Sequence, residues 1–164
     1  MKVKRYFIGS IFVGAIMLIV LTLFSGGRPL TGGELLLAEV IFGDSIDYDQ
    51  VRIKSGGSLT WIYPGVTLGN VIAFPEGAYD ETDIKAQALL LHELTHVWQY
   101  QSAGWGYVPR ALYEEVFQQA YVIHYDESKS FTDYDIEEQG EIVAEYFLMG
   151  DRRFEVYIEE IQGK

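Results

Sequence analysis

The stretch IKAQALLLHELTHVWQY, residues 84–100, decides the fold, because this long apolar segment carries the motif His92-Glu-Leu-Thr-His96. Its side chains are apolar nearly all round, which is the pattern of a helix buried inside a domain. Residues four apart lie one above the other on a helix, so His92 and His96 can present two imidazoles to one metal ion. The segment therefore predicts a central helix with a metal site on one face.

Glu93, beside the first histidine, indicates what that metal would do. An unpaired carboxylate buried away from water is costly or is neutralised by a shift of its pKa, so a cation is the economical partner for these three groups. Zinc with three protein ligands keeps a fourth position for water, and a neighbouring glutamate can accept the proton of that water. We predict Zn²⁺ as the cofactor and Glu93 as general base. A hydrogen-bonded structural cluster is the alternative.

The motif itself does not supply a third ligand. The longer pattern HExxHxxGxxH is absent, because Gln99 stands in place of its glycine and Ser102 in place of its last histidine. His124, the remaining histidine, lies in a predicted amphipathic helix over residues 110–126, where a lone histidine is more often packed or exposed than a ligand. His124 and Tyr134 remain candidates for a donor to a transition state.

A second predicted helix, residues 136–149, offers carboxylates for the third position. Glu138, Glu141 and Glu145 lie on one side of this helix, next to apolar positions. A carboxylate four residues after a ligand can hydrogen-bond the far nitrogen of a bound histidine and fix its tautomer. We therefore predict Glu141 as the third metal ligand and Glu145 as the carboxylate that hydrogen-bonds a metal-bound histidine. Glu138 is the other candidate ligand, and a solvated acidic face is the alternative.

The motifs HELTHVWQ and, downstream, EQGEIV resemble the glutamate-zincin metallopeptidases. The resemblance implies a zincin fold with zinc held by His92, His96 and Glu141, and with Glu93 as the base. In that family a Glu-x-x-x-Asp pair supplies the third ligand and its partner, and Glu141 with Glu145 matches this pair with glutamate replacing aspartate. Over residues 30–149 the chain also resembles small bacterial zincin-like proteins labelled Vgr-related or Rhs-related, names associated with type VI secretion.

Residues 1–28 are interpreted as a membrane anchor or a signal segment. Residues 6–24 carry no charge and follow three basic side chains, and a helix of that length spans about 28 Å against a hydrocarbon core of about 30 Å. A secretory signal cleaved at residues 25–27 is the alternative. We expect a single-pass membrane protein with residues 29–164 as its catalytic domain on the non-cytoplasmic side, or a secreted protein if the segment is cleaved.

Charge and composition limit the classes of molecule that this protein is expected to bind. All 24 acidic residues of the chain, but only part of its 12 basic residues, follow residue 28. Binding nucleic acid relies on neutralising phosphates with Lys and Arg, so we expect no nucleic acid partner. The chain has no cysteine, and so its composition does not indicate a redox compartment.

The remaining patterns predict a compact α+β domain. Thr31 to Glu34 has the form of a capping box that opens a helix over residues 35–42. Three β-rich segments separated by glycine-containing turns predict a small twisted sheet, antiparallel or mixed, packed on the HExxH helix; they are residues 51–53, 59–63 and 71–74. Residues 71–74 are the candidate edge strand.

Taken together, these features predict a membrane-anchored zinc metallopeptidase that hydrolyses peptide bonds in a peptide or protein substrate. Two alternatives stay open: a non-catalytic zincin-like binding module, and an accessory or effector protein associated with type VI secretion. The first is favoured by the small size of the domain, which leaves little room for a second substrate-binding lobe. The sequence assigns neither substrate-binding residues nor an oligomeric state.

Overall fold

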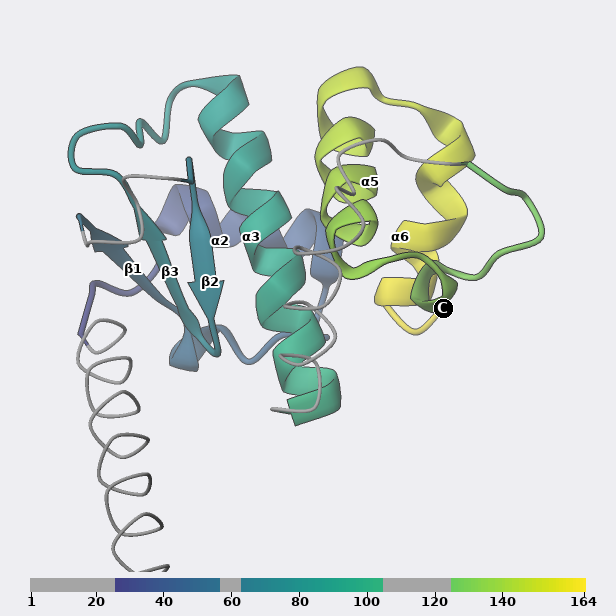
Figure 1. Cartoon of the computed structure of the whole chain (residues 1–164), viewed down its shortest axis with the longest axis horizontal. Coiled ribbons are helices and arrows are strands. Elements are labelled where there is room, and N and C mark those ends of the chain that lie inside the picture. Colours follow the sequence, from purple (N-terminus) through teal and green to yellow (C-terminus); the bar gives the residue numbers. More distant parts are fainter. Residues whose placement is uncertain (1–25, 57–62, 105–124) are drawn as a thin grey trace, which may run out of the picture.

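The computed structural model describes residues 26–56, 63–104 and 125–164. Within these ranges α3 stands between a small sheet and α5 (Figure 1). The helices and strands are α2 (Gly32–Phe42), β1 (Arg52–Ser55), β2 (Val66–Leu68), β3 (Val71–Phe74), α3 (Ile84–Ala103), α5 (Ile136–Met149) and α6 (Glu155–Ile161), with short 3-10 helices at Tyr48–Gln50, Phe131–Asp133 and Arg152–Phe154. These elements confirm the predicted α+β class, but they do not show a zincin fold.

The sheet is mixed and has the strand order β1-β3-β2. β3 pairs in parallel with β1 and antiparallel with β2, so that Ile72 lies opposite both Ile53 and Thr67. The prediction that residues 71–74 form an edge strand is therefore wrong, because β3 is central. β2, which the sequence did not indicate, packs against the motif helix and reaches Glu93 through Thr67. The strand predicted at residues 59–63 falls outside the described residues except for its last position.

The capping box predicted at the start of α2 is confirmed. The Thr31 side chain accepts a hydrogen bond from the Glu34 backbone N–H, and the Glu34 carboxylate accepts one from the Thr31 backbone N–H. Arg28 donates two hydrogen bonds of 2.7 Å to the same carboxylate, which is almost fully buried. Burial opposes its ionisation, but these hydrogen bonds outweigh burial and lower the pKa of Glu34. The bonds tie the described N-terminal residues to the domain.

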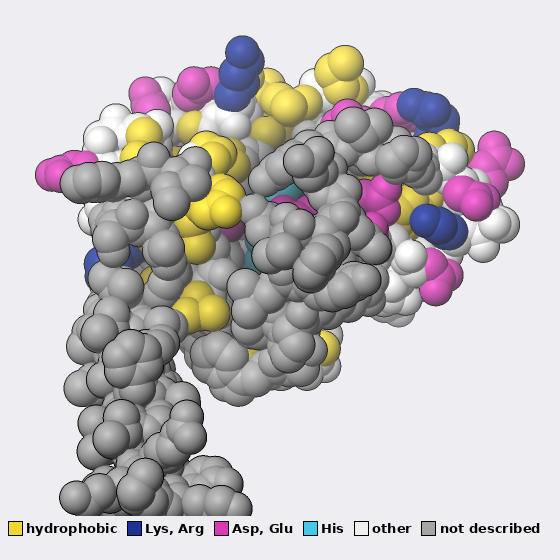
Figure 2. All heavy atoms as spheres, in the orientation of Figure 1, with side chains coloured by type: hydrophobic (Ala, Val, Ile, Leu, Met, Phe, Trp, Pro, Cys, Tyr) yellow, Lys and Arg dark blue, Asp and Glu magenta, His cyan; other side chains and the backbone are white. Residues whose placement is uncertain are grey.

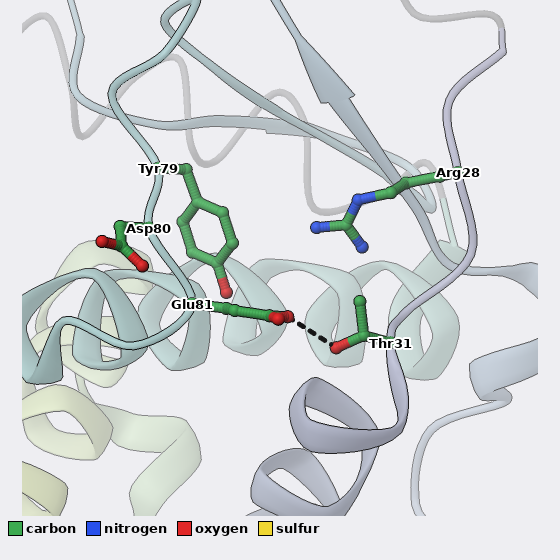
Figure 3. A pocket seen from close by; sticks show the side chains of 5 residues that line it. All are labelled: Arg28, Thr31, Tyr79, Asp80 and Glu81. Carbon is green, nitrogen blue, oxygen red and sulfur yellow. Dashed lines mark hydrogen bonds between the residues drawn. The ribbon is translucent and has the colours of Figure 1, made fainter.

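A surface pocket of about 520 Å³ opens beside the start of α2. Figure 3 shows the side chains that line it, Arg28, Thr31, Tyr79, Asp80 and Glu81. The Thr31 hydroxyl donates a hydrogen bond of 2.8 Å to Glu81. None of the candidate metal ligands lines this pocket.

α3 is the central element of the described core. It begins after Asp83, whose side chain accepts a hydrogen bond from the Lys85 backbone N–H, and ends at Gly104, which has a positive φ of 64°. Ten of its residues are buried, and they include both motif histidines and Glu93. The sheet packs against one side of α3 and α5 against another (Figure 1). Burial on both sides explains why the sequence of this helix is apolar nearly all round.

Within the described part of the chain, no helix combines the length and the apolar character needed to cross a bilayer. The segment predicted to cross one, residues 6–24, lies outside the described residues. The division into residues 1–28 and residues 29–164 therefore stays a prediction.

We expect Leu94→Ala to reduce the free energy of unfolding by about 2 to 5 kcal/mol, because it removes a large side chain that is fully buried in the core around α3. Leu36→Ala is the matched control, since Leu36 on α2 is 66% exposed. Its effect should stay within about 0.5 kcal/mol. Urea unfolding of the two variants beside the wild type measures the difference, and equal effects would contradict the central position of α3.

Candidate metal centre

His92 and His96 lie one turn apart on α3, with their rings edge to face and the ring centroids 5.0 Å apart. Their Nε2 atoms are 3.2 Å apart. One carboxylate oxygen from α5, Oε2 of Glu137, lies 3.3 Å from His92 Nε2 and 3.5 Å from His96 Nε2. Two helices therefore bring three donor atoms together at one place.

The spacing of the three atoms is that of ligands around a small cation. Zinc binds imidazole nitrogen and carboxylate oxygen at about 2.0 to 2.2 Å in tetrahedral geometry, which places neighbouring ligand atoms about 3.3 to 3.6 Å apart. The observed separations are 3.2, 3.3 and 3.5 Å. Among the described residues, His92, His96 and Glu137 form a group whose donor atoms all lie within 4.8 Å of one another. The residues present therefore fit a zinc ion.

The other ring nitrogen of each histidine faces an oxygen. His92 Nδ1 lies 3.4 Å from Oε1 of Glu141, and His96 Nδ1 lies 2.9 Å from Oε1 of Gln99. Because an ionised carboxylate can only accept, Glu141 favours the proton of a neutral His92 on Nδ1. The Nε2 lone pair of that ring then points at the other donor atoms. A cation satisfies such converging lone pairs, whereas a hydrogen bond between two unprotonated nitrogens is impossible.

Electrostatics at the site favour positive charge. Burial on its own would lower the pKa of His92, but hydrogen bonds to Glu137 and Glu141 outweigh it and raise the pKa to about 10. Burial is likewise outweighed at His96, whose pKa is raised by the hydrogen bond to Glu137. Burial would raise the pKa of Glu137, and its bonds to both rings lower it instead. The cluster is thus built to hold a carboxylate beside bound protons or a bound cation.

Glu93 lies beside this cluster and is held in place by the sheet. It is 4% exposed, and its charge favours the protonated form of His92. The Thr67 hydroxyl on β2 lies 2.6 Å from Glu93 Oε2 and donates a hydrogen bond to it. A Cβ atom at Gly65 would lie 2.9 Å from the Glu93 carboxyl carbon, so only glycine lets this backbone pass so close. The sequence predicted Glu93, but not the two residues that hold it.

The carboxylates of α5 are placed one helical turn earlier than the sequence analysis predicted. Glu137, which was not among the candidates, contributes the oxygen nearest both Nε2 atoms. Glu141, predicted as the third ligand, faces the far nitrogen of His92 instead. Glu145, predicted for that supporting role, is exposed. The pairs 137/141 and 141/145 have the same spacing, so spacing alone could not choose between them.

Glu138, the other candidate ligand, is buried for a different reason. Its carboxylate accepts a hydrogen bond of 3.2 Å from the Asp135 backbone N–H and so completes the capping box that opens α5. A capping residue of this kind satisfies backbone groups that the first turn of a helix leaves unpaired. The structure thus gives Glu138 a role in starting α5.

Gly140 is the sequence signal that could have identified the correct turn. A Cβ atom there would lie 2.7 Å from both Cε1 and Nδ1 of His92, closer than nonbonded atoms can approach. Glycine inside a helix costs about 1 kcal/mol relative to alanine, so its presence marks a place where another group comes close. Gly140 lies between Glu137 and Glu141 on the α5 surface that meets the histidines.

Of the two other candidate donors, only Tyr134 is among the described residues. His124 lies outside the described residues. The Tyr134 side chain is fully buried, and its hydroxyl lies 2.9 Å from that of Tyr157 and 3.1 Å from the backbone oxygen of Asp126. These contacts give the Tyr134 hydroxyl a structural role, and the prediction that it acts as a donor at the site is not supported.

The site lies near the surface and is not sealed in the core. His92 and His96 are each 8% exposed, and cyan histidine surface is seen beside magenta acidic surface near the centre of the face in Figure 2. A zinc ion bound by three protein ligands lowers the pKa of a water in its fourth position to about 7. The buried carboxylate of Glu93 adds negative charge next to this site.

Comparisons with known proteins relate this chain to secretion systems. The family model of the eCIS core domain matches residues 39–104. The type VI secretion system spike protein VgrG2b of Pseudomonas aeruginosa is 35% identical over 138 residues, which is 74% of this chain and only 13% of that protein. The solved effector domain of Pseudomonas aeruginosa VgrG2b is 32% identical, with a TM-score of 0.64 over 83% of this chain and 82% of the other.

These similarities correct the predicted family and activity. The matching descriptions are a core domain, a spike protein and an effector domain, and none of them is named as a peptidase. These matches support the resemblance to Vgr-related proteins. They do not support the resemblance to the glutamate-zincin metallopeptidases. The predicted family and activity, a zinc metallopeptidase that acts on a peptide substrate, are therefore wrong by these similarities.

The predicted membrane partner and single-pass location are corrected as well. The segment on which they rested is not among the described residues, and no described helix could span a bilayer. The spike protein similar to this chain belongs, by its name, to a secretion system. The predicted single-pass membrane location and membrane partner are therefore not supported.

Gly140→Ala should separate α5 from α3 at the metal centre. The added methyl group would collide with the His92 ring, so we expect the free energy of unfolding to fall by about 1 to 3 kcal/mol despite the better helix propensity of alanine. Gly33→Ala is the matched control, because the nearest atom to a Cβ there is 3.9 Å away. It should be neutral or gain up to about 1 kcal/mol. Urea unfolding distinguishes them, and equal stability would show that α5 does not approach His92 so closely.

Proposed function

The chain belongs to the same family as the effector domain of Pseudomonas aeruginosa VgrG2b, and from this we propose that it is a secretion-associated effector or accessory domain that binds a divalent cation. The cation lies between α3 and α5 in this proposal. His92, His96 and Glu137 are its ligands, and zinc is the metal that their nitrogen and oxygen donors favour.

One observation carries the metal part of this proposal: three donor atoms from two helices lie 3.2 to 3.5 Å apart. Supporting groups face the far nitrogen of each histidine, Glu141 at His92 and Gln99 at His96. Such partners orient metal-bound histidines and fix their tautomers. A cluster that served only to fill the core would need neither the three converging donor atoms nor the two polar groups behind the histidines, because burying polar groups is costly.

The secretion part rests on similarity over the domain. The chain matches most of the solved effector domain, and it spans 13% of the length of the whole spike protein. We infer that the chain corresponds to the effector portion of such proteins. Export by a type VI secretion apparatus, or attachment to one, is the role that follows from this correspondence.

The purified protein should bind one zinc ion per chain, and Glu137→Gln should weaken that binding most among the α5 carboxylates, because it removes a ligand. Glu141→Gln should weaken it about 10- to 100-fold, the usual effect of losing a partner of a metal-bound histidine. Competition with a chromophoric chelator measures each affinity.

Glu145→Gln is the control in this series, since Glu145 is exposed on the same helix, and it should bind zinc as the wild type does. A strong loss in Glu141→Gln with none in Glu137→Gln would restore Glu141 as the ligand. No zinc binding by the wild type would end the metal proposal.

A tagged copy of the chain, produced in a bacterium with an active type VI secretion system, should reach the culture medium or co-purify with the apparatus. Neither should occur in an otherwise identical strain in which that system is disabled. Immunoblots of medium and purified apparatus measure this. A His92→Ala variant controls for the metal centre and should be exported equally well if it folds. Retention of the wild type in both strains, without co-purification, would refute the secretion proposal.

A further inference from the structure

We propose that Gln99 and Gln139 act as a relay of two amide side chains that fixes the tautomer of His96 and directs its Nε2 lone pair at the cation. This inference rests on the proposed metal site and assigns it two positioning residues. Both are buried, with Gln99 6% and Gln139 3% exposed. They come from α3 and α5, which lie side by side in Figure 1.

The relay is a continuous chain of short contacts. Gln139 Nε2 donates to the Tyr134 backbone oxygen at 2.9 Å. Gln99 Nε2 donates to Gln139 Oε1 at 2.9 Å and to the Ile136 backbone oxygen at 3.0 Å. Gln99 Oε1 then lies 2.9 Å from His96 Nδ1. Counting only partners in the described part of the chain, every polar group of the two amides is hydrogen-bonded except the second hydrogen of Gln139.

The orientation of both amides follows from backbone groups that can only accept. A carbonyl oxygen has no hydrogen to give, so the Tyr134 oxygen requires the NH₂ end of Gln139. The oxygen end of Gln139 must then face Gln99, and the Ile136 oxygen independently requires the NH₂ end of Gln99. If either amide were turned over, its oxygen would face a backbone oxygen, so only the orientation described makes these hydrogen bonds.

The consequence for His96 is a defined proton position. Gln99 presents an oxygen to Nδ1, so Nδ1 must carry a hydrogen. A neutral ring has only one N–H, and Nε2 is left with a lone pair directed at His92 Nε2 and the Glu137 carboxylate. Two backbone carbonyls, that of Tyr134 before α5 and that of Ile136 at its start, thereby determine which nitrogen of His96 can bind a cation.

The relay also explains why an amide and not a carboxylate stands here. An amide both donates and accepts, so it can be bonded to backbone oxygens on one side and to a ring N–H on the other. His92, by contrast, faces a carboxylate. The two histidines are thus oriented by different groups, one charged and one neutral, and the total negative charge around the cation stays smaller.

The test compares zinc affinity with stability in a set of glutamine variants. Gln99→Met removes the acceptor and should weaken zinc binding about 10- to 100-fold. Gln99→Glu keeps an acceptor at Nδ1 but loses both donated bonds, so it should be less stable and yet stay within a few-fold of wild-type zinc affinity. Gln101→Met is the matched control: Gln101 lies on the same helix and bonds Asp47 and Asn70, and its loss should leave zinc affinity unchanged.

A purely structural role for Gln99 would lower zinc affinity in proportion to stability in both of its variants, and that result would overturn the relay. If Gln99→Met does not fold, Gln139→Met takes its place. It leaves Gln99 held only by the Ile136 oxygen, and a several-fold weaker zinc affinity is expected. Wild-type affinity in both methionine variants would equally refute the proposal.

Nitrogen NMR of histidine-labelled protein gives a direct readout of the tautomer. In the zinc-loaded wild type, and in metal-free protein at alkaline pH where the ring is neutral, His96 should carry its proton on Nδ1. A proton on His96 Nε2 would contradict the proposed relay. If the wild type bound no zinc, the metal site would be wrong, while the tautomer in the metal-free protein would still decide the relay by itself.

Discussion

The close approach of α5 to α3 at Gly140 is the constraint on which the rest of the site depends. With no side chain at that position, the α5 backbone can lie against the His92 ring. This contact brings Glu137 to both Nε2 atoms and Glu141 to the far side of His92. It also lets Gln99 and Gln139 meet between the helices. One missing methyl group thus permits the whole arrangement.

Burial of the charged and polar groups is the reason why this arrangement favours a bound cation. Two imidazoles and the Glu93 carboxylate are largely buried, and charges removed from water need compensation by nearby charges and hydrogen bonds. The sheet supplies Thr67 for Glu93, and α5 supplies partners for the histidines. These partners leave the Nε2 atoms of both histidines and the Glu137 carboxylate facing one point between the two helices. A divalent cation at that point meets the need for compensation with one particle.

The family similarity changes the function inferred for this site, while the geometry of the site stays the same. An HExxH helix suggests a peptidase because that motif is widespread among such enzymes, which is an argument from association. The relatives named by similarity are a spike protein and an effector domain. What the motif does determine physically is a pair of imidazoles on one helical face, and this holds for any protein that uses them.

Local patterns in the sequence determined the elements whose causes are local. The capping box at Thr31, the span of α5 and the imidazole pair of α3 all follow from hydrogen bonds and spacings within a few residues. Only the tertiary structure decided that β3 is central and that Glu137 rather than Glu141 joins the histidines. Glutamates recur at a four-residue interval on α5, so every turn looks alike in sequence. Which turn faces α3 depends on how two distant helices pack, and no local preference records that.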